Sequence, residues 1–490
     1  MAEKRRLLAD RAVADGFRSC YGWLRHVGSS SKGQHNPISY NVEMRALLIS
    51  TYDLGRQPLG LASPAAWLRR SGVEVDCADT SREMLDEGRI AAASLVGFYL
   101  PMHTATRLAG PVIERVRRAN PAARLCAYGL YAPLNAAWLR ERGIQHVLGP
   151  DAEAELVELA TTSQPATATP KRVPFIQPDR MGLPPLERYA SLRMPDGSTR
   201  TIGSTDTTRG CKHLCRHCPI VPVYRGRFTA VPVDVVLEDI RAQVRVGARH
   251  ITFGDPDFFN GPTHARRIVE RLSKEFPGVS YDATIKIEHL LAHADLIPLL
   301  RNTGCLFVTS AVESVDDTVL EQLQKGHTRG DFVRAVTICR EVGLTLSPTF
   351  IPFTPWTSLE GYVELLDVLN DLGIVEQVAP VQLGIRLLVT AESPLLHLPG
   401  IQERVTEFEP ASLTWPWRHE DHRVDDLQAA VMRIVKSTSG ATRGETFDAI
   451  SRLAREQAGL PIGTRRPTSV TPVPVVSEPW YCCAEPMETF

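Results

Sequence analysis

The sequence predicts an α/β protein in which a doubly wound parallel sheet is followed by a partial β/α barrel and a C-terminal extension. Short apolar runs alternate with amphipathic helical patterns over most of the 490 residues. Two segments rich in Pro, Thr and Ser, at 161–172 and 461–479, bury little and bracket the central part. Alternation of strand and helix favours parallel sheets covered by helices, with ligands at the carboxyl ends of the strands.

The first domain is expected over residues 44–160, after an N-terminal extension over 1–43. Its strand candidates are the apolar runs RALLIST, SLVGFYL, RLCAYG and HVLG. Helices are expected around PAAWLRRSG, GPVIERVRRAN and NAAWLRERG, and one more at the end of GPDAEAELVELA. This order predicts a doubly wound domain.

The barrel is expected over residues 201–400, after a linker over 161–200. Its strand candidates are residues 250–255, 281–287, 305–312, 344–351 and 381–389. Helices are expected at DVVLEDIRAQVRVG, at DFVRAVTICREVG and after Thr357, which has capping-box spacing with Glu360. Functional groups should lie at the C-terminal ends of the strands. A helical extension over 401–460 and a Pro-rich tail over 461–490 complete the prediction.

Composition restricts the class of protein. The 55 basic and 56 acidic residues give no overall field that would attract nucleic acid or a membrane surface. The N-terminus lacks the apolar core of a signal peptide, and no later apolar run approaches about 18 residues. Ten cysteines, most of them solitary, do not resemble a secreted disulfide framework. We therefore expect a cytoplasmic protein with neither nucleic acid nor membrane as partner.

The segment TTRGCKHLCRHCPI places Cys211, Cys215 and Cys218 close together, with His213 and His217 between them. A structural zinc site usually takes two spaced pairs of ligands, and no second pair is visible. Three thiolates bound to a four-iron cluster leave one iron open for a ligand. An iron-sulfur cluster is the favoured interpretation, and zinc or a metal-free loop are the alternatives.

The spacing Cys211-x3-Cys215-x2-Cys218 resembles the signature of the radical S-adenosylmethionine (SAM) superfamily. Other segments, FGDPDFFNGP, ATIKIEHL, VESVDDTVLEQLQKGHT and PTFIPFTPWTS, resemble the branch in which a Rossmann-like, cobalamin (B12)-binding-like domain precedes the barrel. This resemblance covers about residues 44–400. The terminal WYCCAEP further resembles the CUAEP/CCAEP-tail radical SAM proteins, in which selenocysteine can occupy one position.

The resemblance implies a [4Fe-4S] cluster whose open iron chelates the amino and carboxylate groups of SAM. One electron, from a donor such as flavodoxin or ferredoxin, would then break a carbon-sulfur bond of the sulfonium and give a carbon radical. In the family the residue before the third cysteine is usually aromatic, and here it is His217.

The resemblance also implies which residues hold SAM. A glycine-rich turn with a carboxylate for the SAM amino group usually follows a strand, and Gly254, Asp255 and Asp257 occupy that place. A plain turn with solvated aspartates is the alternative. Glu313 resembles a family position near the ribose hydroxyls.

Three more charged residues are candidates for the SAM site. Lys286 and Glu288 lie at the end of the strand candidate 281–287. Arg386 lies inside an apolar run, where an unpaired charge is costly. It would meet either the SAM carboxylate or a structural acid.

Cobalamin domains often carry DxHxxG, in which His replaces the lower axial base. Here the corresponding TYDLGRQPLG has Asp53 followed by Leu54, and no histidine occupies the ligand position. Gly129 and Ser94 lie where such a domain contacts its cofactor, although both positions also suit packing. The domain therefore binds cobalamin without a histidine ligand or serves as a scaffold.

The predicted function is radical transfer of a methyl or another SAM-derived group to a small molecule. One alternative is radical alkylation of a soft atom such as trivalent arsenic, held by Cys482 and Cys483. Another alternative, from a different class, is a non-catalytic iron-sulfur or cobalamin sensor. A zinc-stabilised interaction module is the third.

Overall fold

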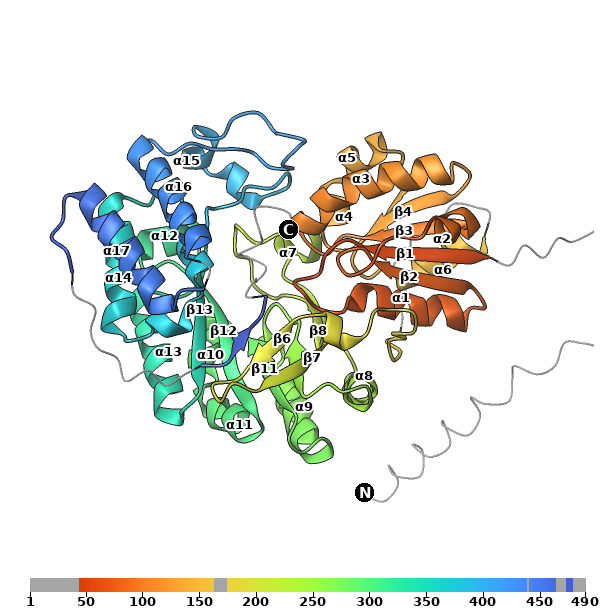
Figure 1. The fold of residues 1–490 in the computed structure, drawn as a ribbon, viewed down its shortest axis with the longest axis horizontal. Helices are drawn as coiled ribbons and strands as arrows, with labels where there is room; N and C mark the ends of the chain where they lie inside the picture. The colour runs from red at the N-terminus through yellow and green to blue at the C-terminus, as the bar shows by residue number, and fades with distance from the viewer. Residues whose placement is uncertain (1–43, 163–173, 439, 464–472, 479–490) are drawn as a thin grey trace, which may run out of the picture. The chain divides into compact units, whose positions relative to one another are not determined.

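The structure is a computed structural model that describes residues 44–162, 174–438, 440–463 and 473–478 (Figure 1). The predicted N-terminal extension over 1–43 and the cysteine pair Cys482 and Cys483 lie outside the described residues. No helix in the described ranges is both long and apolar enough to cross a bilayer.

The first sheet confirms the doubly wound prediction. Its five strands are all parallel, in the order β2-β1-β3-β4-β5. The strands are β1 (Arg45–Ser50), β2 (Glu74–Asp79), β3 (Leu95–Tyr99), β4 (Arg124–Tyr128) and β5 (His146–Val147). Helices α1 (Leu59–Arg70), α2 (Glu87–Ala92), α3 (His103–Ala119), α4 (Tyr131–Leu134), α5 (Ala136–Glu141) and α6 (Glu153–Thr161) complete this part.

The alternation of side chains along β1 explains how both faces of this sheet are covered. Leu47 and Ile49 pack with α2, α3 and α5 on one face, and Ala46 and Leu48 pack with α1 and α6 on the other. Strand β2, with the sequence EVDCAD, was not predicted. It is an edge strand with polar residues at alternate positions, so it lacks the continuous apolar run of the central strands.

The second sheet is the wall of a partial β/α barrel, with strand order β13-β12-β11-β10-β7-β6-β14. Five of its strands are parallel: β7 (Thr199–Thr205), β10 (His250–Phe253), β11 (Ser280–Thr284), β12 (Cys305–Glu313) and β13 (Thr345–Phe350). β6 (Ser191–Arg193) and β14 (Val475–Val476) extend one edge with antiparallel pairing.

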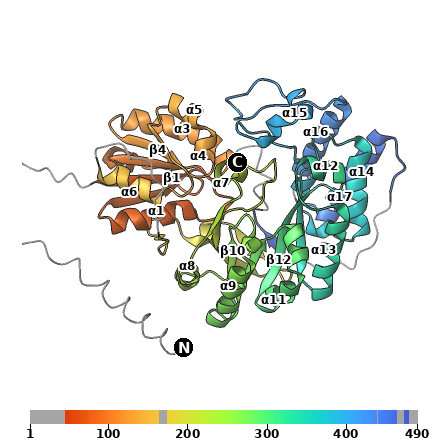
Figure 2. The same ribbon diagram turned by 180° about the vertical axis from the view of Figure 1, so that it is seen from behind.

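Helices cover one face of the second sheet, as Figure 2 shows from behind. They are α8 (Val233–Arg245), α9 (Pro262–Glu275), α10 (Ile287–Ala292), α11 (Ile297–Asn302), α13 (Arg329–Val342) and α14 (Leu359–Asp371). Helix α12 (Asp317–Gln322) follows β12. The C-terminal part contains α15 (Pro399–Gln402), α16 (His422–Ser437) and α17 (Arg443–Ala458).

The structure corrects two predictions in the barrel. Residues 381–389 form no strand: they begin in a 3-10 turn (Pro380–Leu383) and make one isolated bridge, between Phe353 and Arg386. The apolar residues of this run are buried by packing, for example where Gly384 lies against Met432 of α16. Helix α14 is capped by Ser358, whose hydroxyl accepts from the Gly361 amide, and not by Thr357.

Candidate functional site

The cysteine segment is a loop closed at its base by a small hairpin. Strand β8 (Thr208–Gly210) pairs with β9 (Phe228–Ala230), and the cysteines and helix α7 (Ile220–Tyr224) lie between them. Gly210 has φ +83°, and a Cβ there would lie 2.4 Å from the carbonyl oxygen of Arg227. Glycine therefore lets the hairpin close next to the first cysteine.

Hydrogen bonds to the backbone of the loop fix it on the C-terminal edge of the second sheet. Asn260 lies in the turn after β10. Its side-chain oxygen accepts from the backbone amide of Lys212 (3.2 Å), and its side-chain nitrogen donates to the Gly210 carbonyl (3.2 Å). The Arg216 amide donates to the Leu323 carbonyl at the end of α12 (3.0 Å). The loop is thus held by elements that follow two different strands.

The three thiols of the loop are the candidate ligands of the cluster. Cys211 and Cys215 are buried and Cys218 is half-buried. Burial raises the pKa of Cys211 to about 11, so this thiol stays protonated unless a cation replaces the proton.

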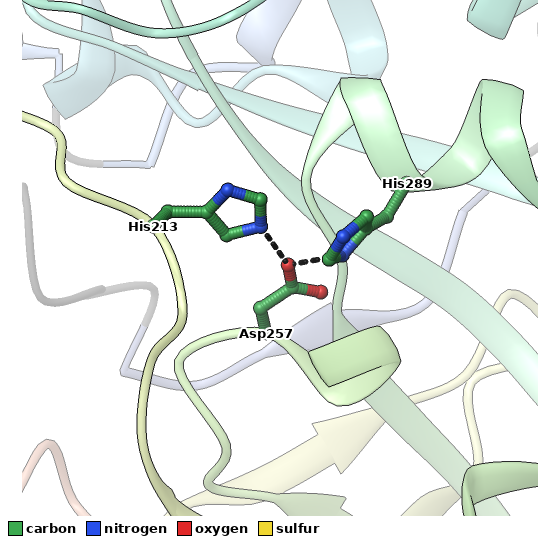
Figure 3. A group of neighbouring side chains, drawn as sticks. All are labelled: His213, Asp257 and His289. Carbon is green, nitrogen blue, oxygen red and sulfur yellow. Dashed lines mark hydrogen bonds and ion pairs between the residues drawn. The ribbon is translucent and has the colours of Figure 1, made fainter. Parts of the chain in front are cut away.

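Asp257 is the centre of a cluster that connects the cysteine loop to the barrel (Figure 3). Its carboxylate oxygen Oδ2 lies 3.1 Å from His213 Nε2 in the loop and 2.6 Å from His289 Nδ1 in α10. Its Oδ1 accepts from the Phe259 amide (3.1 Å). Burial alone would raise the pKa of Asp257, but the hydrogen bonds from both histidines lower it below its usual range.

These three side chains also lie close enough together to share a metal ion, because their ligand atoms are within 4.8 Å of one another. The sequence predicted a role for Asp257 but gave no sign of its partners. His213 was noted only as a residue between cysteines, and His289 carries no motif of its own.

Glu313 forms a second connection to the loop. It ends β12 with φ +71°, and its Oε1 lies 3.1 Å from His217 Nε2 and 3.3 Å from Lys325 Nζ. All three side chains are buried. Burial lowers the pKa of His217 below its usual value. The histidine before the third cysteine is thus oriented by a carboxylate.

Lys286 and Glu288 lie near the same loop. Lys286 Nζ is 3.3 Å from Glu288 Oε2, and this oxygen is 3.6 Å from His213 Nδ1. Of the residues expected near SAM, four therefore lie around the cysteine loop: Asp257, Lys286, Glu288 and Glu313.

Asp255 and Gly254 do not contact the histidines or cysteines of the loop but pack against the segment that precedes it. Both oxygens of Asp255 are occupied by Thr207 and Thr208, through the Thr207 amide (2.8 Å) and the two hydroxyls (2.7 and 2.6 Å). A Cβ on Gly254 would lie 2.2 Å from Asp206 Oδ1. These two residues connect β10 to the segment between β7 and β8 and so position the base of the loop. Asp255 is thus neither a solvated turn residue nor a free carboxylate.

Arg386 lies in a separate cluster. It donates to Asp425 (2.6 Å) and to the Trp417 carbonyl (2.7 Å), and its guanidinium lies 3.5 Å from the centre of the Trp417 ring. Of the two partners expected for Arg386, the structure therefore has the structural acid.

A cavity of about 170 Å³ lies where the first domain meets the barrel. Tyr99, Tyr128 and Gly129 line it from the ends of β3 and β4, and Asp206 and Arg209 line it from the segment after β7. This is the edge of a doubly wound sheet at which ligands bind. The position of Gly129 agrees with the expectation. Ser94 precedes β3, at the opposite end of that strand.

This cavity is open to solvent, and its volume is below the about 300–1,000 Å³ of pockets that enclose drug-sized ligands. The ring of Tyr99 lies directly against the backbone of α1, where a Cβ on Gly60 would be 2.1 Å from it. No histidine is among the described residues that line the cavity.

Comparison with known proteins agrees with this geometry. Residues 205–369 match the family model described as the radical SAM superfamily. Two curated relatives are tRNA-2-methylthio-N(6)-dimethylallyladenosine synthases, from Vibrio vulnificus (24% identical over 259 residues) and Photobacterium profundum (22% over 274). The alignments cover 50% and 53% of this chain, and 52% and 55% of the relatives, so the chain spans about half their length.

Two solved structures share the fold over most of the chain. One is the cobalamin-dependent SAM radical enzyme OxsB with aqua-cobalamin bound (TM-score 0.61, 13% identity, 81% of this chain and 68% of that chain). The other is the radical SAM methyltransferase TsrM from Kitasatospora setae with cobalamin and a [4Fe-4S] cluster (TM-score 0.58, 17% identity, 84% and 99%). The chain therefore contains a radical SAM domain at residues 205–369, within a fold shared with cobalamin-dependent radical SAM enzymes.

Proposed function

We propose that the protein is a radical SAM enzyme in which Cys211, Cys215 and Cys218 hold a [4Fe-4S] cluster. The observation that carries the proposal is the cysteine loop, fixed by hydrogen bonds on the C-terminal edge of the barrel sheet. When bound, the cluster and SAM together supply one-electron cleavage of a carbon-sulfur bond. The electron would come from a small donor protein such as flavodoxin or ferredoxin.

The residues around the loop would bind and orient SAM. A carboxylate is the natural partner of an ammonium group, and Asp257 is kept ionised by its two histidine partners. Lys286 provides a cation close by, and Glu313 provides a second buried carboxylate. Arg386 has no part in this proposal, because Asp425 and Trp417 already engage it.

The proposed reaction class is transfer of a methyl or other SAM-derived group to a small molecule. Relatives and neighbours support group transfer in general, since one is named a methyltransferase and others are named methylthio-adenosine synthases. A more specific alternative is alkylation of a soft atom held by Cys482 and Cys483. The alternative from another class of protein is a non-catalytic iron-sulfur or cobalamin sensor.

Anaerobic reconstitution with iron, sulfide and SAM tests the proposal. The wild-type protein should turn brown and, on reduction, release 5′-deoxyadenosine or methylthioadenosine, which mass spectrometry detects. Replacing Cys211, Cys215 or Cys218 by Ala should abolish the chromophore and SAM cleavage together. Cys339→Ala, at a buried thiol in α13, is the matched control and should keep both.

Two kinds of result would contradict the proposal. Full SAM cleavage by any one of the three loop variants would exclude the assigned ligands. A stable cluster without either SAM product would favour the sensor, and a colourless reconstituted protein would favour zinc.

Cobalamin binding has its own test. If the protein binds cobalamin, electron paramagnetic resonance of the cob(II)alamin form should show no coupling to a histidine nitrogen. A histidine coupling would refute the prediction of a missing protein ligand. Failure to bind cobalamin would favour the scaffold role of the first domain.

A further inference from the structure

Two histidine rings and one carboxylate meet where the cysteine loop contacts the barrel. Figure 3 shows the rings of His213 and His289 directed at the same carboxylate oxygen of Asp257. This oxygen, Oδ2, is 3.1 Å from His213 Nε2 and 2.6 Å from His289 Nδ1. The side chains of His213, His289 and Asp257 are only 11%, 5% and 0% exposed. A cation at this point would therefore be enclosed by the protein.

The three side chains come from separate elements, so the fold and not the local sequence brings them together. Asp257 precedes the 3-10 turn Phe258–Asn260, and its other oxygen, Oδ1, accepts from the Phe259 amide (3.1 Å). His289 lies in α10, and His213 lies in the cysteine loop. The oxygen that faces both rings is thus the one that the turn does not use.

Two imidazole nitrogens and one carboxylate oxygen are typical ligands of zinc and similar divalent metal ions. Three such ligands leave a fourth position for water. Ligands about 2.1 Å from a tetrahedral zinc ion lie about 3.4 Å apart, so His213 and Asp257 already have nearly the required separation. His289 would have to move away from Asp257 by less than about 1 Å. Mg²⁺ prefers oxygen ligands and should not bind here.

A second carboxylate lies behind one of the two rings. Glu288 Oε2 is 3.6 Å from His213 Nδ1 and 3.3 Å from Lys286 Nζ. Metal-binding histidines usually direct their second nitrogen at a carboxylate, a carbonyl or a water, which keeps the proton on that nitrogen and leaves the first nitrogen for the metal. His213 has this arrangement, with Nε2 toward Asp257 and Nδ1 toward Glu288.

We propose that His213, Asp257 and His289 bind one zinc ion, and that zinc and SAM exclude each other at this site. The exclusion rests on the proposed function, in which Asp257 pairs with the amino group of SAM. A zinc ion on Oδ2 would repel that ammonium group. On binding, zinc takes the place of the protons that the rings present to Asp257. Each neutral ring keeps one proton on its other nitrogen, and zinc loses three of its waters.

Zinc binding is measured on the full chain with its cluster, by anaerobic dialysis followed by metal analysis. The protein should bind one zinc ion per chain in addition to the iron of the cluster. X-ray absorption at the zinc edge should show nitrogen and oxygen ligands at about 2.0–2.1 Å and no sulfur at about 2.3 Å. Sulfur ligands would place the zinc on cysteines and would overturn the proposed site.

Two variants test the ligands. His289→Ala and Asp257→Asn should each weaken zinc binding by at least about tenfold, because each removes one of three protein ligands. Asp257→Asn keeps the size of the side chain, so it tests the site even if His289→Ala does not fold. His293→Ala is the matched control, because the His293 ring lies 5.9 Å from that of His289 and packs edge-on against Phe259. Equal zinc affinity in all four proteins would overturn the site.

Equilibrium binding of SAM tests the exclusion. At a free zinc concentration about ten times the Kd of zinc, the apparent Kd of SAM should rise about tenfold in the wild-type protein. The same zinc concentration should leave the SAM affinity of His289→Ala unchanged, and Mg²⁺ should have no effect on either protein. An unchanged SAM affinity in wild-type protein that has bound zinc would overturn the exclusion.

The outcomes separate this site from the proposed function. Cluster formation and SAM cleavage in the zinc-free protein test the proposed function alone. A protein that has the brown chromophore and cleaves SAM but binds no zinc would refute the metal site and leave the proposed function intact. Failure of the zinc-free protein to bind SAM would contradict the proposed function and the exclusion, while zinc analysis and X-ray absorption would still decide the metal site.

Discussion

Asp257 is a single carboxylate that receives its two histidine partners from different elements, the cysteine loop and α10. The carboxylate is fully buried, so each partner it loses leaves an acceptor without compensation. In the proposed SAM site, the orientation of Asp257 would therefore depend on two histidines that do not themselves need to touch SAM.

Replacing His289 by Ala should weaken SAM binding about tenfold while leaving the cluster chromophore intact. Loss of a hydrogen bond to a buried charged group costs about 1–3 kcal/mol, and His289 is not a proposed cluster ligand. Equilibrium binding of SAM, with the absorption spectrum recorded in parallel, measures both effects. His293→Ala is the control, because His293 lies one helical turn after His289, at the C-terminal end of α10, and packs edge-on against Phe259 rather than binding Asp257. Unchanged SAM affinity in His289→Ala would contradict the positioning role.

Asp255 should make stability depend on pH. Burial, with a smaller contribution from Asp206, raises the pKa of Asp255 from 3.8 to about 7. Between these values the folded protein holds a proton that the unfolded chain has released. The free energy of unfolding therefore decreases as pH rises from about 4 to 7, by up to about 1.4 kcal/mol per pH unit from this group.

Asp255→Asn should remove this part of the slope. Denaturant unfolding at several pH values between 5 and 8 measures this slope. The slope is compared rather than the absolute stability, because Asn has one acceptor oxygen where Asp255 uses two, one for the Thr207 amide and one for the hydroxyls of Thr207 and Thr208. Equal slopes in the two proteins would show that Asp255 does not carry the titration.

The β8–β9 hairpin is the element that positions the first cysteine. Gly210 and Gly197 both have φ +83°, but only Gly210 has backbone within contact distance of a Cβ, whereas the space around Gly197 is open. Substitution at Gly197 therefore tests backbone strain alone, whereas substitution at Gly210 tests backbone strain together with a steric clash.

Gly210→Ala should reduce the amount of cluster bound after reconstitution, while Gly197→Ala should leave it unchanged. Both variants incur a left-handed penalty of about 1–2 kcal/mol, but only the methyl group added at Gly210 would force Arg227 or Tyr224 to move. Iron and sulfide content per chain is the measurement. Equal loss of cluster in both variants would mean that strain alone, and not the closed hairpin, is responsible.

Residues 381–389 show why an apolar run alone does not predict a strand. An apolar run is buried equally well by a strand neighbour or by a helix, and here α16 covers it. The choice between Thr357 and Ser358 as cap had the same origin, because the two residues are adjacent and both carry a hydroxyl group.

At the scale of the whole molecule, Arg209 joins the cysteine loop to the first domain. Its guanidinium lies 2.6 Å from Glu153 at the start of α6 and 3.1 Å from the hydroxyl of Ser63 in α1. The side chains of Arg209 and Glu153 are only 15% and 9% exposed. Burial alone would raise the pKa of Glu153, but the charge and hydrogen bonds of Arg209 lower it below its usual value.

Glu153→Gln should lower the stability of the protein by about 3 kcal/mol at neutral pH, because it removes the buried carboxylate beside Arg209 and leaves only Asp151, whose side chain is 53% exposed, as the anionic partner. The pKa of Glu153 is depressed in the folded state, so the difference from wild type should shrink as pH falls through that pKa. Denaturant midpoints at about pH 7 and about pH 4 measure both effects. Glu87→Gln, at an exposed pair with Arg115, is the control and should cost less than about 1 kcal/mol.

The sequence by itself determined the elements and the chemistry of the loop. Central strands such as β1 and β12 bury both faces and therefore read as apolar runs, and three cysteines close in the chain carry their ligand spacing locally. These signals depend on neighbours along the chain. Edge strands such as β2 and β14 are short or half polar, so they lack the same signal.

Only the tertiary structure decided which side chains meet. His289 and Lys325 reach the site because parallel strands end at one edge and bring the segments that follow them together, although they are distant in sequence. The fold also places Arg386 in an ion pair with Asp425 and Glu478 in an ion pair with Arg82. A buried charged side chain pairs with whichever opposite charge or polar group the fold brings within hydrogen-bond distance. The separation of two residues in the sequence does not show whether they come that close in the folded protein.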